Sequence, residues 1–250
     1  MSTHLPTQPS TQRPIPGGVL VINKPPGLTS HDVVQRARHA LGIKQIGHAG
    51  TLDPMAEGVL VLLVGSATTY QRVAQGHRKR YEAVITLGIK TDTGDRWGRV
   101  VQTAPVPSFS RVQVEAVLIS CLGPLTQIPP LYSAVKVRGR PLYWWARRGE
   151  APIASQRTIE IFALELIELA GDRIRCRVEC SAGTYIRCLA EEIAERLGTT
   201  GHVSQLIRLS VGPWDLYQAV PIERLTREHL EALLATIHPV ETIHACAHRT

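Results

Sequence analysis

Apolar and polar residues follow regular patterns from Val19 onward, and these patterns predict both strands and helices. Short apolar or alternating runs predict strands at residues 19–22, 59–64, 81–87, 158–169 and 173–181, the last two forming a hairpin. Apolar residues at helical spacing, bounded by capping residues and glycines, predict helices at residues 30–41, 111–122, 184–197 and 226–235. Because these elements alternate without the regularity of βαβ units, we expect an α+β fold with a largely antiparallel sheet.

The N-terminus and the cysteines indicate where the protein works. Residues 1–17 contain four prolines and no apolar pattern, which predicts a disordered tail. The longest apolar run, residues 59–64, is too short to span a bilayer, and the N-terminus lacks the apolar stretch of a secretory signal. The five cysteines fit no paired zinc spacing, so we expect free thiols in a reducing compartment. Together these features predict a cytoplasmic protein with no membrane segment.

The charge balance bears on the partner. Twenty-eight Lys and Arg against 21 Asp and Glu give a formal net charge of +7 over 250 residues. This excess favours a polyanionic partner, and nucleic acid before membrane, because no basic amphipathic helix stands out. Many basic proteins bind no nucleic acid, so charge alone leaves the partner open.

The sequence contains none of the common signatures of cofactor and metal sites. It has no phosphate-binding glycine loop, no dinucleotide fingerprint and no G-x-S-x-G nucleophile motif. Its ten histidines show no metal-binding spacing, and the segment 92–95 lacks the ligand register of a calcium loop and predicts a plain turn. We therefore expect neither a cofactor nor a metal.

A polar, glycine-rich loop at residues 47–58 directly precedes the apolar run at 59–64. Loops held by a rigid strand often carry functional side chains. Pro54 restricts the backbone of Asp53 to extended conformations, which directs the carboxylate reproducibly. Asp53 is therefore a candidate catalytic residue, although an Asx-turn or a helix cap is the commoner role of an Asp-Pro pair.

The loop sequence GHAGTLDPMAEG (47–58) resembles the catalytic loop of the tRNA pseudouridine(55) synthase family, the TruB type. Five further segments resemble motifs of that family, and all six follow the family's order. They are KPPGLTS (24–30), KRY (79–81), TDTGD (91–95), PPLYSAVKVRG (129–139) and CSAGTYIR (180–187). The resemblance implies the pseudouridine synthase fold, with a catalytic domain at residues 18–215, an RNA-clamping insertion at about 124–156 and a basic cleft crossing one sheet.

The family converts the uridine at position 55, in the TΨC loop of tRNAs, to pseudouridine. This isomerisation breaks the N1–C1′ bond and joins C5 to C1′, so it requires no oxidant, metal or cofactor. The resemblance makes Asp53 the catalytic carboxylate, either as nucleophile or as base. It implies that Arg187 pairs with Asp53, that Tyr81 stacks on the target base and could help remove the C5 proton, and that Lys24 supports the loop.

The resemblance also implies contacts with the T-arm stem-loop of the tRNA. His48 is expected to enter the RNA loop and occupy the space of extruded bases. Four basic residues are further candidates for RNA binding: Lys79, Arg80, Lys136 and Arg208.

Two other basic stretches each have two explanations. Residues 138–148 interleave aromatic and cationic side chains, which suits RNA contact but equally suits a helix that buries Leu142 and Trp145. The outward-facing arginines of the strand at 173–181 could bind phosphates, but pairing with Glu165 and Glu168 across the hairpin is favoured.

The sequence departs from the family pattern at two places. Ile207 stands where the first arginine of a pair usually lies, and residues 216–250 are too short for the family's usual C-terminal RNA-binding module of the PUA type. The guide-RNA-dependent dyskerin type relies on that module and on partner proteins. Either the lineage lacks this module or the chain is truncated. Its absence favours a stand-alone enzyme that contacts the T-arm directly, without an obligatory protein partner. No feature of the sequence indicates self-association, so we expect a monomer.

A tRNA-folding chaperone activity, in place of catalysis or in addition to it, is the alternative function. The set of Asp53, Tyr81 and Arg187 argues against chaperone activity as the sole function, though both activities could coexist.

Overall fold

The computed structural model describes residues 17–244, so residues 1–16 of the predicted tail lie outside the described residues. The strands are β1 (Gly18–Lys24), β2 (Ile46–His48), β3 (Glu57–Val64), β4 (Lys79–Leu87), β5 (Ile89–Thr91), β6 (Val100–Thr103), β7 (Gly123–Gln127), β8 (Lys136–Val137), β9 (Arg140–Pro141), β10 (Arg157–Ala170), β11 (Arg173–Cys180), β12 (Gly201–Val211), β13 (Trp214–Asp215), β14 (Val220–Pro221) and β15 (His238–Pro239). The α-helices are α1 (Ser30–Leu41), α2 (Gln71–Gly76), α3 (Arg111–Ser120), α4 (Leu142–Ala146), α5 (Ile186–Arg196) and α6 (Leu230–Ala235). Short 3₁₀ helices lie at Gly65–Tyr70, Leu216–Gln218, Ile222–Arg224, Arg227–His229 and Val240–Ile243.

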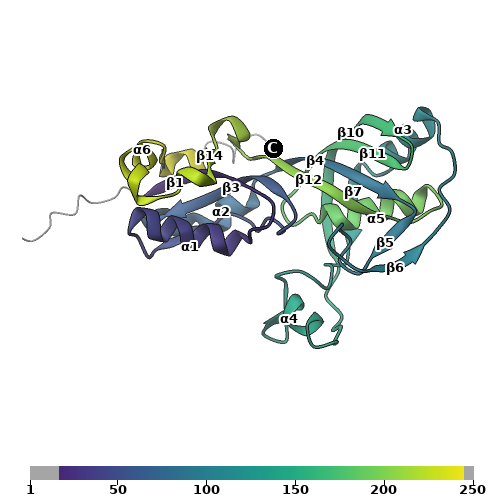
Figure 1. Cartoon of the computed structure of the whole chain (residues 1–250), viewed down its shortest axis with the longest axis horizontal. Helices are drawn as coiled ribbons and strands as arrows, with labels where there is room; N and C mark the ends of the chain where they lie inside the picture. The colour runs from purple at the N-terminus through teal and green to yellow at the C-terminus, as the bar shows by residue number, and fades with distance from the viewer. Residues whose placement is uncertain (1–16, 245–250) are drawn as a thin grey trace, which may run out of the picture.

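Most strands belong to one large sheet with the order β14-β1-β3-β12-β4-β11-β10-β7. Neighbouring strands are antiparallel except at β1–β14 and β3–β12, which are parallel. The predicted α+β fold with a largely antiparallel sheet is therefore confirmed. Figure 1 shows β4 and β12 joining one lobe, which holds β1, β3, α1 and α6, to another, which holds β10, β11, α3 and α5.

The unbroken apolar run of β3 is explained by burial on both faces of the sheet. Leu60, Leu62 and Val64 pack into the larger hydrophobic core, whereas Val59, Val61 and Leu63 pack into a second core on the opposite face. All six side chains are fully buried. Alternation disappears where neither face of a strand meets water, so β3 provides a rigid base for the loop that precedes it.

Capping residues begin and end the first helix where the sequence predicts. The Thr29 hydroxyl accepts a hydrogen bond from the Asp32 N–H at 3.1 Å, and the Asp32 carboxylate accepts one from the Thr29 N–H at 2.8 Å. This reciprocal pair is a capping box. Gly42 ends the helix with φ of 68°, a left-handed conformation that favours glycine. The entry of α1 beside the loop at residues 47–58 is thus set by local sequence.

Two predicted helices differ from the structure at their ends. Helix α5 begins at Ile186, two residues later than predicted, and still holds Arg187 in its first turn. The predicted helix at 226–235 divides into the 3₁₀ turn Arg227–His229 and the short helix α6. The Thr226 side chain bonds to the ring of His229 at 2.9 Å and caps no backbone N–H, so an α-helix does not start there.

The predicted pairing of the outward-facing arginines of the hairpin with Glu165 and Glu168 was wrong for Arg175 and Arg177. Strands β10 and β11 pair in the predicted hairpin, but the guanidinium groups of Arg175 and Arg177 both pair with Glu82 on β4. Strand β11 lies between β10 and β4, so its outward side chains have neighbours on two sides. The side chain of Glu82 is largely buried and reaches both arginines, which explains the preference.

The segment at residues 128–156 leaves the sheet and carries β8, β9 and α4, which project from the rest of the molecule in Figure 1. The first residues of the expected insertion, 124–127, instead belong to β7 and pair with β10. Within α4 Leu142 is buried and Trp145 is half-buried, in keeping with the packed-helix explanation of this stretch. Among residues 17–244 no helix has the length and apolar character needed to cross a membrane.

Candidate active site

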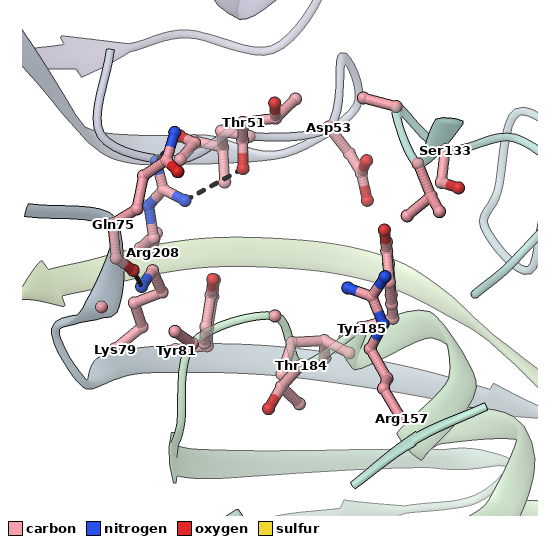
Figure 2. Close-up of a pocket in the computed structure, with 18 of the residues that line it drawn as sticks. Thr51, Asp53, Gln75, Lys79, Tyr81, Ser133, Arg157, Thr184, Tyr185 and Arg208 are labelled. Atoms are coloured by element: carbon pink, nitrogen blue, oxygen red, sulfur yellow. Dashed lines mark hydrogen bonds between the residues drawn. The ribbon is translucent and has the colours of Figure 1, made fainter. Parts of the chain in front are cut away.

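A cavity of about 540 Å³ lies over β4 and β12, where the two lobes meet. Its walls are formed by the loop residues 50–53, by Arg72, Gln75 and Gly76 of α2, by residues 133–135 of the projecting segment and by residues 182–186, which lead into α5. Figure 2 shows Asp53 and Tyr185 at one end of this pocket and Lys79 and Gln75 at the other, with Tyr81 between them. Segments that are far apart in sequence therefore meet around one cavity.

Asp53 and Arg187 form a two-point ion pair at one end of the pocket. The Arg187 Nε donates to Asp53 Oδ2 at 2.9 Å, and Nη2 donates to Oδ1 at 3.2 Å. The Arg187 side chain is 3% exposed and that of Asp53 is 28% exposed, so the carboxylate faces the cavity while the guanidinium lies behind it. Within residues 17–244 Arg187 is the sole hydrogen-bond donor to this carboxylate, so the Asx-turn and cap alternatives do not apply.

Two of the other sequence motifs orient Arg187 through their backbones. Its Nη1 donates to the Thr93 carbonyl at 2.7 Å, and its Nη2 donates to the Tyr132 carbonyl at 3.0 Å. Thr93 belongs to the TDTGD turn and Tyr132 to the PPLYSAVKVRG segment. A planar guanidinium with four hydrogen bonds has little freedom to turn. These motifs therefore act on the aspartate indirectly, by holding its partner.

The KPPGLTS segment supports the loop that carries Asp53. The Ser30 hydroxyl bonds with both the carbonyl and the N–H of Leu52, at 3.1 and 2.8 Å. The Lys24 ammonium is fully buried and donates to the carbonyls of Pro25 and Leu28 at 2.8 Å each and of Pro54 at 3.4 Å. Lys24 thus lies behind the loop and joins the turn after β1 to the residue that follows Asp53.

Arg208 and Lys79 are buried rather than presented to solvent. Arg208 is 1% exposed and donates to the carbonyls of Val59, Thr51 and Gly50 at 2.7, 3.1 and 3.2 Å. Its nitrogens are bonded to the backbone of the loop and of β3, so an RNA group could reach the guanidinium only by displacing these carbonyls. β12 runs directly beside the start of β3, which brings Arg208 under the loop.

Lys79 also bonds to the protein backbone. It is 6% exposed, and its ammonium donates to the carbonyls of Gln75 and His77 at 2.8 and 2.6 Å. Although Lys79 lines the pocket, its hydrogen bonds hold the corner between α2 and β4. An RNA phosphate would have to displace these backbone partners to reach it.

Tyr81 stands on the floor of the pocket (Figure 2) and is 6% exposed. Burial raises the pKa of its phenol to about 12, so the hydroxyl is protonated at neutral pH. A protonated phenol can stack and donate a hydrogen bond, but it cannot accept a proton as a base in this state.

The other predicted RNA-binding residues lie outside the lining of the pocket. His48 is half-buried on β2, and burial, followed by the nearby Arg208, lowers the pKa of its imidazole. Arg80 is exposed and donates from Nε to the Ser210 hydroxyl at 3.0 Å. Lys136 is exposed on β8 of the projecting segment. The structure therefore brings together Asp53, Tyr81, Arg187, Lys79 and Arg208 but not these three.

Among the charged and aromatic residues that line the pocket, three were not predicted from the sequence. Arg72 lies on α2, Arg157 is the first residue of β10, and Tyr185 immediately precedes α5. The position of Tyr185 beside Arg187 was an available signal. Its backbone is fixed by Gln127, whose side-chain amide bonds with both the N–H and the carbonyl of Tyr185, at 2.9 and 3.2 Å. Arg72 and Arg157 carry no local sequence signal.

Metal ligands are not grouped in the described part of the chain. Residues 17–244 contain no cluster of three or more His, Cys, Asp and Glu side chains that could share an ion. The cysteines at 121, 176, 180 and 188 are free thiols, and burial raises the pKa of each.

A family model described as the N-terminal domain of the TruB family pseudouridylate synthases matches residues 38–186, which is more than half of the chain. The chain belongs to the TruB family of pseudouridylate synthases. A second model, described as the C-terminal domain of tRNA pseudouridylate synthase B, matches residues 187–244. The loop that carries Asp53 lies within the first match, and Arg187 is the first residue of the second.

Individual relatives agree with the family match. A tRNA pseudouridine synthase B from Stutzerimonas stutzeri is 43% identical over 229 residues, which cover 90% of this chain and 75% of that protein. One from Caldanaerobacter subterraneus is 44% identical over 209 residues, which cover 83% and 73%. A solved Cbf5-Nop10-Gar1 complex aligns with a TM-score of 0.69 at 28% identity, covering 90% of this chain and 61% of that one. The predicted family, fold class and enzyme class are confirmed.

The two buried lysines of the TruB site should make stability depend on pH. Burial, and secondarily Arg208, lowers the pKa of both Lys24 and Lys79 to about 8. An unfolded lysine keeps its proton to about pH 10.4. Above pH 8 the two lysines therefore bind more protons in the unfolded chain than in the folded one, and their contribution to stability grows as pH rises. We expect the two lysines together to contribute about +2 kcal/mol to the change in the free energy of unfolding between about pH 7.5 and about pH 8.8.

Urea unfolding at these two pH values measures the effect. Relative to the wild type, Lys24→Met or Lys79→Met should each lower this change by about 1 kcal/mol, and the double variant should lower it by about 2 kcal/mol. Cysteines of the unfolded chain ionise at about pH 8.5 and lower the free energy of unfolding over the same range, but this contribution is common to all the variants and cancels in the comparison. A double variant whose change with pH equals that of the wild type would contradict the assignment.

Proposed function

We propose that this TruB-family chain isomerises the uridine at position 55 in the TΨC loop of tRNA to pseudouridine, with Asp53 as the reacting carboxylate. The observation that carries the proposal is the two-point pair between Asp53 and the buried Arg187, on the wall of a pocket whose floor is Tyr81. The relatives named tRNA pseudouridine synthase B support tRNA as the substrate.

The reaction needs a carboxylate next to the ribose of the target. The N1–C1′ bond breaks, a C5–C1′ bond forms, and the proton leaving C5 is balanced by one gained at N1, so product and substrate are isomers. Asp53 either attacks C1′ as a nucleophile or removes a ribose proton as a base. Both routes require the carboxylate, whose two oxygens accept hydrogen bonds from the guanidinium of Arg187.

The size and lining of the pocket suit a single nucleotide turned out of the RNA. Small-molecule sites usually measure about 300–1,000 Å³, and the cavity of about 540 Å³ falls in that range. Enzymes that act on a base within folded RNA or DNA must extrude it first. Tyr81 then provides an aromatic face for the uracil, and a mainly neutral His48 can occupy the space that the base vacates.

The protein would contact the T-arm without a partner, as a monomer in the cytoplasm. The exposed cations Arg80 and Lys136 are suited to binding phosphates, whereas Lys24, Lys79 and Arg208 hold the backbone around Asp53. Binding that relies on phosphate contacts weakens steeply with salt. Binding that is insensitive to salt would contradict this part of the proposal.

Chemical mapping tests the position of the product. A tRNA transcript and an isolated T-arm stem-loop are treated with the enzyme and then with a carbodiimide that marks pseudouridine, and primer extension locates the mark. We expect a single stop at position 55 in both RNAs and none when that uridine is replaced by cytidine. Stops at other uridines, with none at 55, would overturn the assigned target.

A further inference from the structure

The lining of the active pocket is strongly cationic. Among the described residues that line it, the charged ones are Asp53, Arg72, Lys79, Arg157 and Arg208. Asp53 is already neutralised by Arg187. Uracil carries no charge, so the base alone gives no reason for this excess. The anionic groups nearest a uridine in RNA are the phosphates on its two sides.

Two of the four lining cations are unsuited to a phosphate. Arg208 and Lys79 are 1% and 6% exposed, and their nitrogens donate to backbone carbonyls of the chain itself. A phosphate would have to break these bonds and enter a desolvated site, which is costly. These two residues hold the walls of the pocket.

Arg157 and Arg72 differ because their guanidinium groups have no hydrogen-bond or ion-pair partner among residues 17–244. Arg157 is held at one end of the pocket: it is the first residue of β10, pairs with Gln127 of β7, and lies 5.9 Å from the ring of Tyr185. Figure 2 shows it below Tyr185, at the Asp53 end.

Arg72 belongs to the other end of the pocket. It is exposed on α2, one helical turn before Gln75, whose carbonyl accepts the bond from the Lys79 ammonium at 2.8 Å. Gln75 and Lys79 mark the end opposite Asp53 in Figure 2. An arginine with free donors presents a planar fork that matches the oxygens of a phosphate. The pocket thus has one free arginine at each end.

We propose that Arg157 and Arg72 bind the two phosphates that flank the turned-out uridine, one at each end of the pocket. This inference rests on the proposed function, because it takes the T-arm as the bound RNA. It adds two residues that position the substrate: the nucleotide is held by both of its phosphates, and its sugar is thereby set beside Asp53.

Salt dependence of RNA binding is the first test. Anisotropy of a labelled T-arm stem-loop is measured over a range of KCl for the wild type, Arg157→Gln, Arg72→Gln and the control Arg224→Gln. Arg224 is an exposed arginine of the 3₁₀ turn Ile222–Arg224 that does not line the pocket. Each pocket variant should lower the slope of log K against log[salt] by about 0.7–0.9 and weaken binding about tenfold. Arg224→Gln should leave both unchanged, and Arg157→Lys should restore the slope.

Neutral phosphates provide the second test. A methylphosphonate is placed on the 5′ or the 3′ side of the target uridine, and each RNA is bound to each protein. Neutralising the contacted phosphate should cost the wild type about tenfold in affinity and the matching glutamine variant less than about twofold. The Arg157 variant should be insensitive to neutralisation of one phosphate and the Arg72 variant to neutralisation of the other. Arginines that only stabilise the fold would not show this selectivity.

The outcomes separate this inference from the proposed function. The inference alone is overturned if the wild type forms pseudouridine at position 55 but the variants keep its salt slope and neither arginine couples to a phosphate. A wild type that binds the RNA but forms no pseudouridine overturns the proposed function, and the coupling measured on that RNA still decides the roles of the two arginines. A wild type that does not bind the T-arm overturns both.

Discussion

Asp53→Asn is expected to lower turnover by about 10⁴-fold or more while tRNA affinity changes by less than about threefold. The amide has nearly the shape of the carboxylate, but it is a poor nucleophile and a poor base. It also loses the charge that holds it to Arg187 through two hydrogen bonds. Most of the surface available to RNA is untouched by the change. Single-turnover rates and filter binding on the same preparation measure the two effects.

The experiment also includes a matched control variant and an assay for the alternative chaperone function. Asp172→Asn changes an exposed aspartate in the β10–β11 turn and should leave the rate unchanged. The chaperone alternative predicts that Asp53→Asn still accelerates tRNA refolding, which can be measured separately from turnover. A folded Asp53→Asn enzyme that works within about tenfold of the wild type would contradict the role given to this residue.

Arg187→Met is expected to lower turnover by about 10³-fold and the free energy of unfolding by about 3 kcal/mol. The side chain is 3% exposed, and its removal leaves the Asp53 carboxylate and the carbonyls of Thr93 and Tyr132 without a donor. Unpaired polar groups in a buried site are costly. Arg187→Lys should recover only part of both losses, because an ammonium cannot reproduce the two-point contact.

The same helix provides the control for this second variant. Arg196→Met removes an arginine of α5 that pairs with Glu192, donates to the carbonyl and hydroxyl oxygens of Ser120 and does not line the pocket. It should leave turnover unchanged and lower the free energy of unfolding by less than Arg187→Met does, because its partners are exposed to solvent. Single-turnover rates and urea unfolding of the three variants give the comparison. An Arg187→Met enzyme with the stability and rate of the wild type would show that the pair is dispensable.

Local signals predicted much of the fold because they act within a few residues. Thr29 with Asp32 begins α1 and Gly42 ends it, and the strict alternation from Arg173 to Cys180 becomes a strand with one buried face. The ion pair between Asp53 and Arg187 could also be predicted, since the loop around Asp53 and the segment containing Arg187 both resemble family motifs.

The remaining features depend on which strands become neighbours, and no short stretch of sequence encodes that. Glu82 forms ion pairs with Arg175 and Arg177 because β4 lies beside β11. Arg208 lies beneath the loop because β12 runs parallel to the start of β3. Its motif could suggest a functional arginine but not whether the guanidinium faces RNA or the protein backbone. Arg72 and Arg157 likewise come to line one pocket only through the tertiary fold, because they lie on different elements.

The central claim is that this chain converts a tRNA uridine to pseudouridine through Asp53. The most direct measurement uses a tRNA transcript with tritium at uridine C5, because forming the C5–C1′ bond releases that hydrogen to water. The account predicts release of about one equivalent per tRNA by the wild type, with no added metal or cofactor, and none by Asp53→Asn. A folded wild type that binds the tRNA and releases no tritium would contradict it.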